Sequence, residues 1–370
     1  MAQEKDSSKA GPVAPRPTLR HKGDLTHILA SDGQPDAGRN LPAMQGFAPK
    51  FRDIVDYIVK ITHEIWEERG IGRLYDYYGT NMRIHTSSGD IYTRDKVIES
   101  TIQALAAYPD RRLYTDEVIW CGNDADGYYT SHRLTHEGHN WGHTRYGPPT
   151  GKRVSYRAIA DCVVQAGVIV EEWLVRDELS LLYQLGYDVH EMARTIAQQE
   201  DDAARLVTVP AEPDRLRGQL PPQPLPAAPA EFDIAHFVTR ALHEVWNWRL
   251  LNQVETYYSP RYICESASGR RLYGRNQFVT YVLSLLSPFP DLAVSVDHFC
   301  ALPDGPDRYR TATRWTMQGS HTGPGLYGPP TGQSIRIMGV SHHLVENGKF
   351  VQEWTLFDEF ALLKQLYRPG

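Results

Sequence analysis

Apolar residues along this chain follow first a helical spacing and then an alternating one. The helical spacing is set by four isoleucines: Ile54, Ile58, Ile61 and Ile65. Apolar side chains that recur every three to four residues form one face of an amphipathic helix. Alternation of apolar and polar residues then predicts four strands: 112–120, 128–137, 152–165 and 168–176. Helices followed by a run of strands indicate an α+β domain with a curled antiparallel sheet.

Turn and breaker residues mark the remaining elements. A short strand is expected over 83–89 and a second helix over 94–107, which the Tyr-Pro-Asp tripeptide at 108–110 ends. Ala-Gly at 166–167 predicts a hairpin turn between the last two strands. After Asp177, a short Leu-rich helix closes the unit.

The whole order returns in the second half of the chain. Residues 138–185 align without a gap to residues 319–366 at an offset of 181, and 19 of the 48 positions are identical. Tyr-Gly-Pro-Pro-Thr-Gly at 146–151 returns at 327–332. A repeat of this length predicts two copies of one domain. The corresponding signals in the second copy are helices at 234–245 and 275–286, a strand at 262–269 and a hairpin turn at 347–348.

Stretches rich in proline and charge separate the two copies. We expect an arm over residues 1–45, copy one over 46–197, a linker over 198–231 and copy two over 232–370. Since the arm and the linker carry few large apolar residues, they are expected to be disordered or extended spacers. An alternative role for the arm is to wrap a partner subunit.

Charge and cysteine content exclude several classes of protein. The formal net charge is −6 with both signs interspersed, and no basic stripe suits a nucleic-acid backbone. No apolar run approaches the roughly 20 residues that span a bilayer, and no apolar signal segment is evident, so we expect no membrane association. Four cysteines lack paired metal-ligand spacing, which favours reduced thiols in a cytoplasmic protein: Cys121, Cys162, Cys264 and Cys300.

The motifs of both copies, in this order, resemble the SnoaL-like polyketide cyclase branch of the nuclear-transport-factor-2-like superfamily. In copy two they are Gly-Ser-His-Thr-Gly at 319–323, Gly-Pro-Pro-Thr-Gly at 328–332, Gly-Lys-Phe-Val-Gln-Glu-Trp at 348–354, and Asp358. Copy one matches through 147–151, 172–173 and 177–185. The resemblance covers about 280 residues and implies two tandem conical domains, each with helices packed in a curved antiparallel sheet. It also implies that the two sheets pack together as an internal pseudo-dimer, with further homo-oligomers possible.

The copies depart from the family pattern in different places. Copy one has Gly-His-Asn-Trp-Gly at 138–142, and it keeps a family-like histidine, His85, where copy two has Glu265. Either each site is specialised, or one copy is active and the other is structural.

The aspartate after the last strand is the first catalytic candidate. Alternation puts Asp177 on the same face as Trp173 and Val175, which we expect to face the cavity. Asp358 takes the same place beside Trp354. The resemblance implies a general acid/base at this position, and a carboxylate beside apolar side chains should have a raised pKa. The alternative is that both aspartates only cap the closing helices.

Histidines supply the second set of candidates. His132, Leu134 and His136 share one face of a strand, and Trp315 in the place of Leu134 suggests that this is the inward face. His136 would then face Asp177 across the sheet and could move a proton between two substrate atoms. The alternative is a hydrogen-bonded structural histidine.

Copy two differs from copy one in the strand beside the aspartate. His342 alternates with apolar neighbours and is expected to face inward near Asp358, whereas Asp161 takes its place in copy one. An Asp161–Asp177 pair in one site and a His342–Asp358 pair in the other would do different proton chemistry, because paired carboxylates split their pKa values.

A metal site and a bound cofactor are not expected. Four histidines fall within twelve residues, at 132, 136, 139 and 143, but a strand followed by a loop would not converge them on one ion. No nucleophile motif, P-loop or dinucleotide fingerprint is present.

We therefore expect a cofactor-independent enzyme that acts on a small hydrophobic, cyclic or aromatic molecule in a conical pocket by Asp/His acid–base chemistry. Compatible reactions are cyclisation, isomerisation, dehydration and retro-aldol cleavage of a lignin-like aromatic. The alternative is a non-catalytic binding or assembly module. The expected substrate contacts are aromatic or histidine side chains: Trp66, Trp141, Tyr146, Trp173, Trp246, Trp315, His321 and Trp354.

Overall fold

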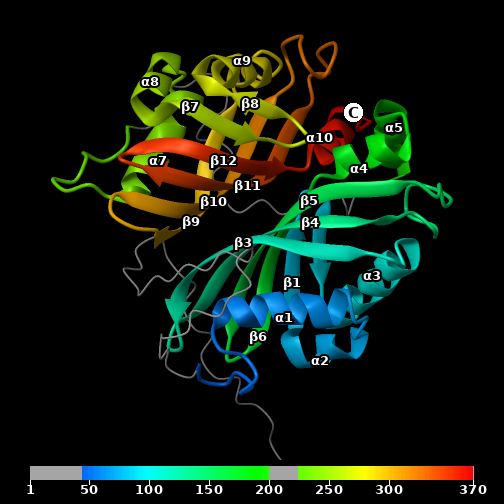
Figure 1. The fold of residues 1–370 in the computed structure, drawn as a ribbon. Helices are drawn as coiled ribbons and strands as arrows, with labels where there is room; N and C mark the ends of the chain where they lie inside the picture. Colours follow the sequence, from blue (N-terminus) through cyan, green and yellow to red (C-terminus); the bar gives the residue numbers. More distant parts are fainter. Residues whose placement is uncertain (1–43, 200–223, 370) are drawn as a thin grey trace, which may run out of the picture.

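The computed structural model describes residues 44–199 and 224–369, so most of the expected arm and linker lie outside the described residues. Two α+β units follow each other along the chain, copy one in blue to green and copy two in yellow-green to red (Figure 1). This confirms the predicted fold class of two tandem conical units.

The elements of the two copies follow the predicted order. Copy one contains α1 (Ile54–Trp66), α2 (Leu74–Tyr77), β1 (Tyr78–Thr86), β2 (Gly89–Tyr92), α3 (Arg94–Ala107), β3 (Arg112–Asn123), β4 (Gly127–His139), β5 (Arg153–Gln165), β6 (Val168–Arg176), α4 (Glu178–Leu185) and α5 (Val189–Gln199). Copy two contains α7 (Ile234–Leu242), a π-helical turn (His243–Asn247), α8 (Val254–Tyr257), β7 (Tyr258–Glu265), β8 (Arg271–Tyr273), α9 (Gly274–Leu286), β9 (Ala293–Pro303), β10 (Arg308–Ser320), β11 (Ser334–Glu346), β12 (Lys349–Phe357) and α10 (Glu359–Leu366). Helix α5 was not predicted.

Each copy forms one six-stranded sheet. The strand orders are β2-β1-β6-β5-β4-β3 and β8-β7-β12-β11-β10-β9. The prediction of a wholly antiparallel sheet is wrong in one respect, because β1 pairs with β6, and β7 with β12, in parallel. Parallel neighbours need a long connection, and here the chain passes through a helix and four strands before it returns beside the first strand.

Local residue chemistry fixes the ends of these elements. The Asp53 side chain accepts a hydrogen bond from the Asp56 amide at 2.7 Å and so caps α1. Both predicted hairpin turns are confirmed, since Ala166-Gly167 and Asn347-Gly348 have positive φ at both positions. Two successive residues of positive φ match the twist of antiparallel strands, and small or Asn/Gly residues adopt that conformation at least cost.

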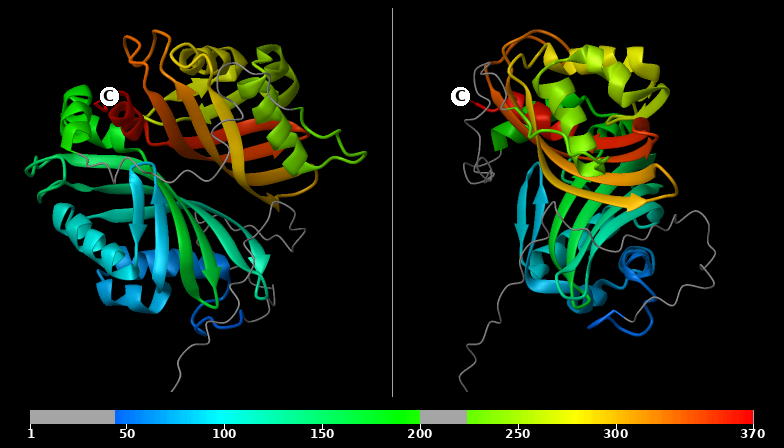
Figure 2. Two further views of the ribbon diagram at one scale, coloured as in Figure 1. Left: turned by 180° about the vertical axis from the view of Figure 1, so that it is seen from behind. Right: turned by 90° about the vertical axis from the view of Figure 1, so that its left-hand side faces the viewer.

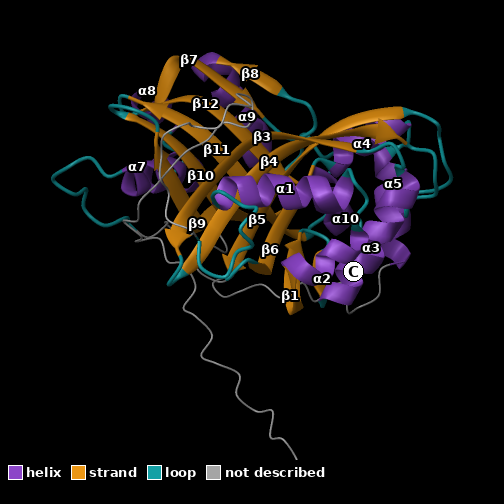
Figure 3. Cartoon of the chain, turned by 60° about the horizontal axis from the view of Figure 1, so that its bottom comes forward, coloured by secondary structure: helices purple, strands orange, loops and turns teal. Residues whose placement is uncertain are grey.

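The two sheets face each other, and α1, α3, α7 and α9 lie on their outer sides, whereas α4 and α5 contact α10 where the copies meet. Figure 2 shows the sheets stacked with α1 and α3 beyond one of them and α7 and α9 beyond the other. Seen from below, α1 lies across the sheet of copy one (Figure 3). Strand β3 contacts β9 and β10, and β12 contacts β5 and β6. Each sheet is therefore covered on both faces, by its own helices and by the other copy.

Among the helices of residues 44–199 and 224–369, none is both long and apolar enough to cross a membrane.

Candidate active site

The two copies enclose cavities of very different size. The cavity between helices and sheet is about 550 Å³ in copy one and about 40 Å³ in copy two. Larger side chains fill the second one, because Trp315 stands where copy one has Leu134, and Phe357 where it has Arg176. Trp315 fits because position 339 is glycine, where an added Cβ would lie 2.2 Å from the indole ring. A cavity of several hundred Å³ matches a small-molecule site, so the candidate site lies in copy one.

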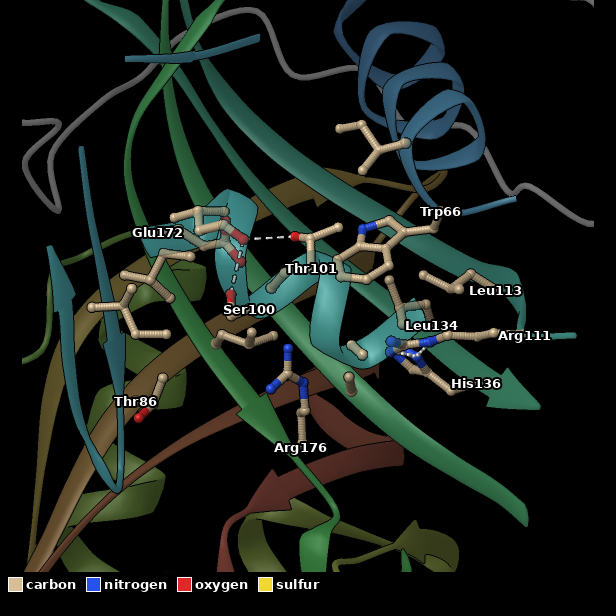
Figure 4. A pocket seen from close by; sticks show the side chains of 18 of the residues that line it. Trp66, Thr86, Ser100, Thr101, Arg111, Leu113, Leu134, His136, Glu172 and Arg176 are labelled. Atoms are coloured by element: carbon tan, nitrogen blue, oxygen red, sulfur yellow. Dashed lines mark hydrogen bonds between the residues drawn. The ribbon is translucent and has the colours of Figure 1, made fainter. Parts of the chain in front are cut away.

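Side chains from the inward faces of helices and strands line the copy-one cavity. The apolar wall comes mainly from α1, α3 and β4, with Trp66, Tyr108 and Leu134 among its residues. Figure 4 shows Arg176 at the centre, Glu172 to one side, and Arg111 with His136 to the other. The cavity therefore places a few charged groups within an apolar surface.

Glu172 is one of three buried carboxyl groups that line this cavity, and it lies on the inward face of β6. It is 5% exposed, and the Tyr78 hydroxyl donates to its Oε2 at 3.3 Å. Burial raises the pKa of Glu172 to about 7, while the charge of Arg176 and the hydrogen bond from Tyr78 act in the opposite direction. A carboxyl group with such a pKa can take and return a proton near neutral pH.

Arg176 is the cation nearest the middle of the site. It lies two positions beyond Leu174 on the same face of β6 as Glu172, and its side chain points into the cavity (Figure 4). No hydrogen bond or ion pair of Arg176 occurs within residues 44–199 and 224–369. A guanidinium that is half-buried and unpaired is free to bind an anionic oxygen of a ligand.

Arg111 and His136 form a second polar group. The Arg111 Nε donates to His136 Nδ1 at 2.9 Å, and the guanidinium lies 4.7 Å from the centroid of the Trp66 ring. Because arginine can only donate, His136 Nδ1 must accept, which places the ring proton on Nε2. Burial, followed by the charge of Arg111, lowers the pKa of His136 well below its usual value. His136 is therefore a neutral N–H donor rather than a base.

Two further polar atoms face the cavity without a partner in the described part of the chain. They are the hydroxyl of Tyr108, whose residue is 7% exposed, and the hydroxyl of Ser88 in the turn between β1 and β2. A buried hydroxyl without a hydrogen bond is costly, and a ligand in the cavity would relieve that cost. By contrast, His132 is satisfied, since its Nε2 lies 2.9 Å from Thr115 Oγ1, and burial lowers its pKa to about 3.

The end of the cavity beside α4 carries two carboxyl groups from different copies. The Tyr146 hydroxyl donates to Glu178 at 2.6 Å, and Arg145 lies 3.9 Å from the same carboxylate. Asp358, from the start of α10 in copy two, lines the cavity next to them. Burial and then the charge of Glu178 raise the pKa of Asp358, whereas Arg145 and Arg176 offset burial and lower that of Glu178.

Several predicted site residues do lie in this cavity. The inward face of β4 is confirmed, so His136 lines the cavity together with Trp66 and Tyr146. Asp358 also lines it, although the sequence placed that residue in the site of copy two. Trp246 and Trp315 line the small copy-two cavity.

Four predicted residues lie in the contact between the sheets instead. Asp161 accepts from Ser131 at 2.5 Å, and His342 lies 2.8 Å from the same hydroxyl. Trp173 packs under Arg314 and Trp354 under Arg133. The prediction that these residues face the cavities is wrong, because the inward residues of β6 are Glu172, Leu174 and Arg176. Both faces of each sheet are buried, so large apolar side chains on a strand do not identify the cavity face.

The remaining candidates have structural contacts outside the cavity. Asp177 was expected to face inward, but it caps α4 and also accepts from the Ser268 amide of copy two at 2.9 Å. His85 lies between Asp90 and Glu171 and stacks on Trp173. Trp141 is 57% exposed, and His321 lies 3.1 Å from the Thr331 hydroxyl.

Sequence reasoning missed the residues that dominate the cavity, namely Glu172, Arg176, Arg111 and Glu178. One signal was available: Glu172 recurs as Glu353 at the constant offset of the repeat. Within residues 44–199 and 224–369, no cluster of His, Cys, Asp and Glu has the arrangement of a metal site.

Comparisons with known proteins give one family. A family model described as SnoaL-like polyketide cyclase matches residues 57–185 and 236–366, which is more than half of the chain. Among solved structures, the chain is similar to a putative SnoaL-like polyketide cyclase from Jannaschia sp. CCS1 (21% identity, 40% of this chain and 100% of that chain, TM-score 0.34). It is also similar to IdmH, a putative polyketide cyclase from Streptomyces antibioticus (21% identity, 36% of this chain and 96% of that chain, TM-score 0.31). A third similar structure is that of AclR, a putative hydroxylase from Streptomyces galilaeus (23% identity, 36% of this chain and 84% of that chain, TM-score 0.31). No match was found among curated proteins.

Proposed function

Because the chain belongs to the SnoaL-like polyketide cyclase family, we propose that copy one is a cofactor-independent acid–base enzyme of the cyclase or isomerase type. Its substrate is a small, largely apolar carbonyl compound, from which it removes a proton next to the carbonyl group. One observation carries the proposal: Glu172, with its pKa raised to about 7, faces the same cavity as the unpaired Arg176.

The polar residues of the cavity have separate roles in proton abstraction. Glu172 takes the proton from the α-carbon, which leaves the negative charge on the carbonyl oxygen. Arg176 and the Nε2–H of His136 are donors for that oxygen. Donors that are already oriented in a site that excludes water stabilise such a charge more than water does.

The walls of the cavity favour a ring-containing or aromatic substrate. Trp66, Tyr108 and Tyr156 line it, and its volume of about 550 Å³ suits a molecule of one or two rings. Copy two has the equivalent glutamate, Glu353, but the 40 Å³ beside it leaves no room for such a molecule. The proposal therefore assigns the chemistry to copy one alone.

Exchange of the methyl protons of acetophenone for deuterium, followed by proton NMR in heavy water, tests this proposal. We expect Glu172→Gln to lower the enzyme-catalysed exchange by roughly 10²- to 10⁴-fold, which is the usual contribution of a general base. Glu353→Gln, the same change at the equivalent position of copy two, is the matched control and should keep the rate.

Equal exchange rates in Glu172→Gln and in the unmodified chain would overturn the proposal. Tight binding of para-nitrophenol without any exchange would instead identify copy one as a binding module. Circular dichroism and thermal unfolding of both variants would show that the comparison is between folded proteins.

A further inference from the structure

One end of the copy-one cavity is polar where the equivalent end of copy two is apolar. Four side chains form this end, and we call them the Arg111 cluster: Tyr108, Arg111, His136 and Tyr156. At the repeat offset of 181, copy two has four buried apolar residues instead: Phe289, Leu292, Met317 and Ile337. The same frame of helices and strands therefore folds with an apolar core at these positions. The polar side chains of copy one need a reason other than the fold.

Arg111 is buried, and its hydrogen bonds leave one nitrogen free. The residue is 7% exposed. Its Nε donates to His136 Nδ1 at 2.9 Å, Nη2 contacts the same ring nitrogen, and Nη2 also donates to the Tyr156 hydroxyl at 3.4 Å. Within residues 44–199 and 224–369, Nη1 has no hydrogen bond. The guanidinium is thus held on one side by the protein and has donors left for a ligand in the cavity.

The charge of Arg111 is not paired with a carboxylate in the part of the chain that the structure describes. Burial lowers the pKa of Arg111, and the charge of Arg176 acts in the same direction. Glu178 offsets burial in part, but its carboxylate is already bound by Tyr146 and Arg145. A buried charge without a counterion is unfavourable, so an anion in the cavity would stabilise this end.

The hydroxyl groups of the cluster add donors and no carboxylate. The Tyr108 hydroxyl is buried and has no partner among the described residues. Tyr108 and Arg111 belong to one turn, in which the Arg111 amide donates to the Tyr108 carbonyl at 3.2 Å. The Tyr156 hydroxyl accepts from Arg111, and the described residues supply no acceptor for its own proton. A cation surrounded by free donors is complementary to an anion that can only accept hydrogen bonds.

We propose that the Arg111 cluster binds a carboxylate of the substrate, so that the substrates are ring-containing keto acids whose carboxylate lies at the far end from the reacting carbon. Arg111 Nη1 donates to one carboxylate oxygen and the Tyr108 hydroxyl to the other. One negative charge then meets one positive charge, and both orphaned donors are used. The keto part of this inference rests on the proposed function, whereas the carboxylate site does not depend on Glu172.

The second cation of the cavity is less suited to the carboxylate. Figure 4 shows Glu172 and Arg111 on opposite sides of Arg176. Arg176 acts electrostatically on Glu172 and on Glu178, so a carboxylate placed there would meet two acidic groups. At Arg111 it meets hydroxyl groups and the neutral His136 instead. A keto acid bound in this direction brings its carbonyl end to Glu172 and Arg176.

The guanidinium is also oriented before any ligand arrives. The Trp66 ring lies 4.7 Å from it, and the His136 ring stacks on Tyr156 with centroids 4.9 Å apart. A planar cation held in this way loses little freedom on binding. The four residues therefore act as one preformed site rather than as separate polar side chains.

A pair of ligands that differ only in charge tests the carboxylate site. 4-Acetylbenzoate and 4-acetylbenzamide have the same shape, and both carry the acetyl group of acetophenone. Titration calorimetry on the full chain should show the acid bound roughly 10- to 10²-fold more tightly than the amide, which is the usual contribution of a hydrogen bond to a charged group. Equal affinities in the unmodified chain would overturn the inference.

Variants copied from the other half of the chain locate the site. Arg111→Leu introduces the residue found at 292 and should abolish the preference for the acid, and Tyr108→Phe, copied from 289, should lower affinity for the acid roughly tenfold. Arg112→Leu is the matched control, because the Arg112 side chain is 61% exposed and does not line the cavity. It should keep the full preference.

The outcomes separate this inference from the proposed function. A folded Arg111→Leu that still prefers the acid overturns the inference, as does a preference that is lost only in Arg176→Gln. If Arg111→Leu does not fold, Tyr108→Phe decides, since it removes a single hydroxyl group, and an unchanged affinity for the acid would then overturn the inference. Glu172→Gln should bind the acid within about threefold of the unmodified chain and lose exchange of its methyl protons. Exchange that survives in Glu172→Gln overturns the proposed function and leaves the carboxylate site standing.

Discussion

The two copies share a fold but use the space inside it in opposite ways. In copy two, Trp315 and Phe357 fill the cone, and Gly339 makes room for the indole. In copy one, Leu134 and Arg176 leave about 550 Å³ open at the equivalent positions. The frame of helices and strands is the same, so a few inward positions decide whether a copy is a solid core or a binding site.

The two copies also differ in the surroundings of their equivalent buried glutamates. Glu172 faces an open cavity, and burial raises its pKa to about 7. Glu353 receives a hydrogen bond from Tyr262 and lies 3.5 Å from His343, and these partners outweigh burial and lower its pKa. A carboxylate whose partners outweigh its burial stabilises a fold, whereas one whose burial outweighs its partners is available for proton transfer.

The largest expected effect comes from giving copy one the side chains of copy two. Leu134→Trp with Ala158→Gly reproduces the pair at Trp315 and Gly339 and should fill the cavity. We expect acetophenone exchange to fall by roughly 10²-fold or more, as it does when the base is lost. Para-nitrophenol binding by absorbance should be lost as well, and thermal unfolding should be unchanged or raised. Full activity in the folded double variant would contradict the assignment of the site to this cavity.

Truncation of the same positions should show which copy depends on its filled core. Trp315→Ala removes a side chain packed in a core and should cost about 3–5 kcal/mol of unfolding free energy. Leu134→Ala should cost less, because Leu134 borders an existing cavity and its removal leaves fewer broken contacts. Urea unfolding measures both. Equal losses would mean that the two cones are packed alike.

The two equivalent glutamates should give pH dependences of opposite sign. Glu172 has a raised pKa, so its contribution to stability is present below its unfolded value of 4.5 and is lost as pH rises to about 7. Glu172→Gln should therefore gain stability relative to the unmodified chain over that interval, by at most on the order of 3 kcal/mol. Glu353 has a lowered pKa, so its contribution is present above 4.5 and is lost as pH falls. Thermal unfolding at several pH values checks both signs, and parallel curves for the two variants would refute the contrast.

Much of the fold could be predicted from the sequence because helical spacing and turn residues depend only on neighbouring positions in the chain. The helical spacing at Ile54–Ile65, the Pro-Asp breaks and the Ala-Gly and Asn-Gly turns each report on their own neighbourhood. Helix α5 was missed although Val189, Ala193 and Ala197 have helical spacing, because it follows the closing helix and has no counterpart among the described residues of copy two. The parallel β1–β6 pair also lay beyond local signals, since it joins strands about 90 residues apart.

The site was harder to predict because the sequence does not show which face of each strand lines the cavity. His136 was placed correctly through the comparison of Leu134 with Trp315. On β6 the same reasoning chose Trp173, whose indole instead packs against Arg314 of the other copy. Alternation gives two faces, and only the packing of the second sheet reveals which of them encloses the cavity.

The buried charges between the sheets make the pairing of the copies selective. Copy one contributes the acidic Glu117 and Asp161, and copy two contributes Arg310, Arg314 and His342, which bind them at 3.0–3.4 Å. In a pair of first domains, Asp161 would take the place of His342 and face Glu117, and two carboxylates side by side are unfavourable in a buried interface. The Glu117–His342 pair thus favours the pairing of unlike copies, and a single chain supplies one of each.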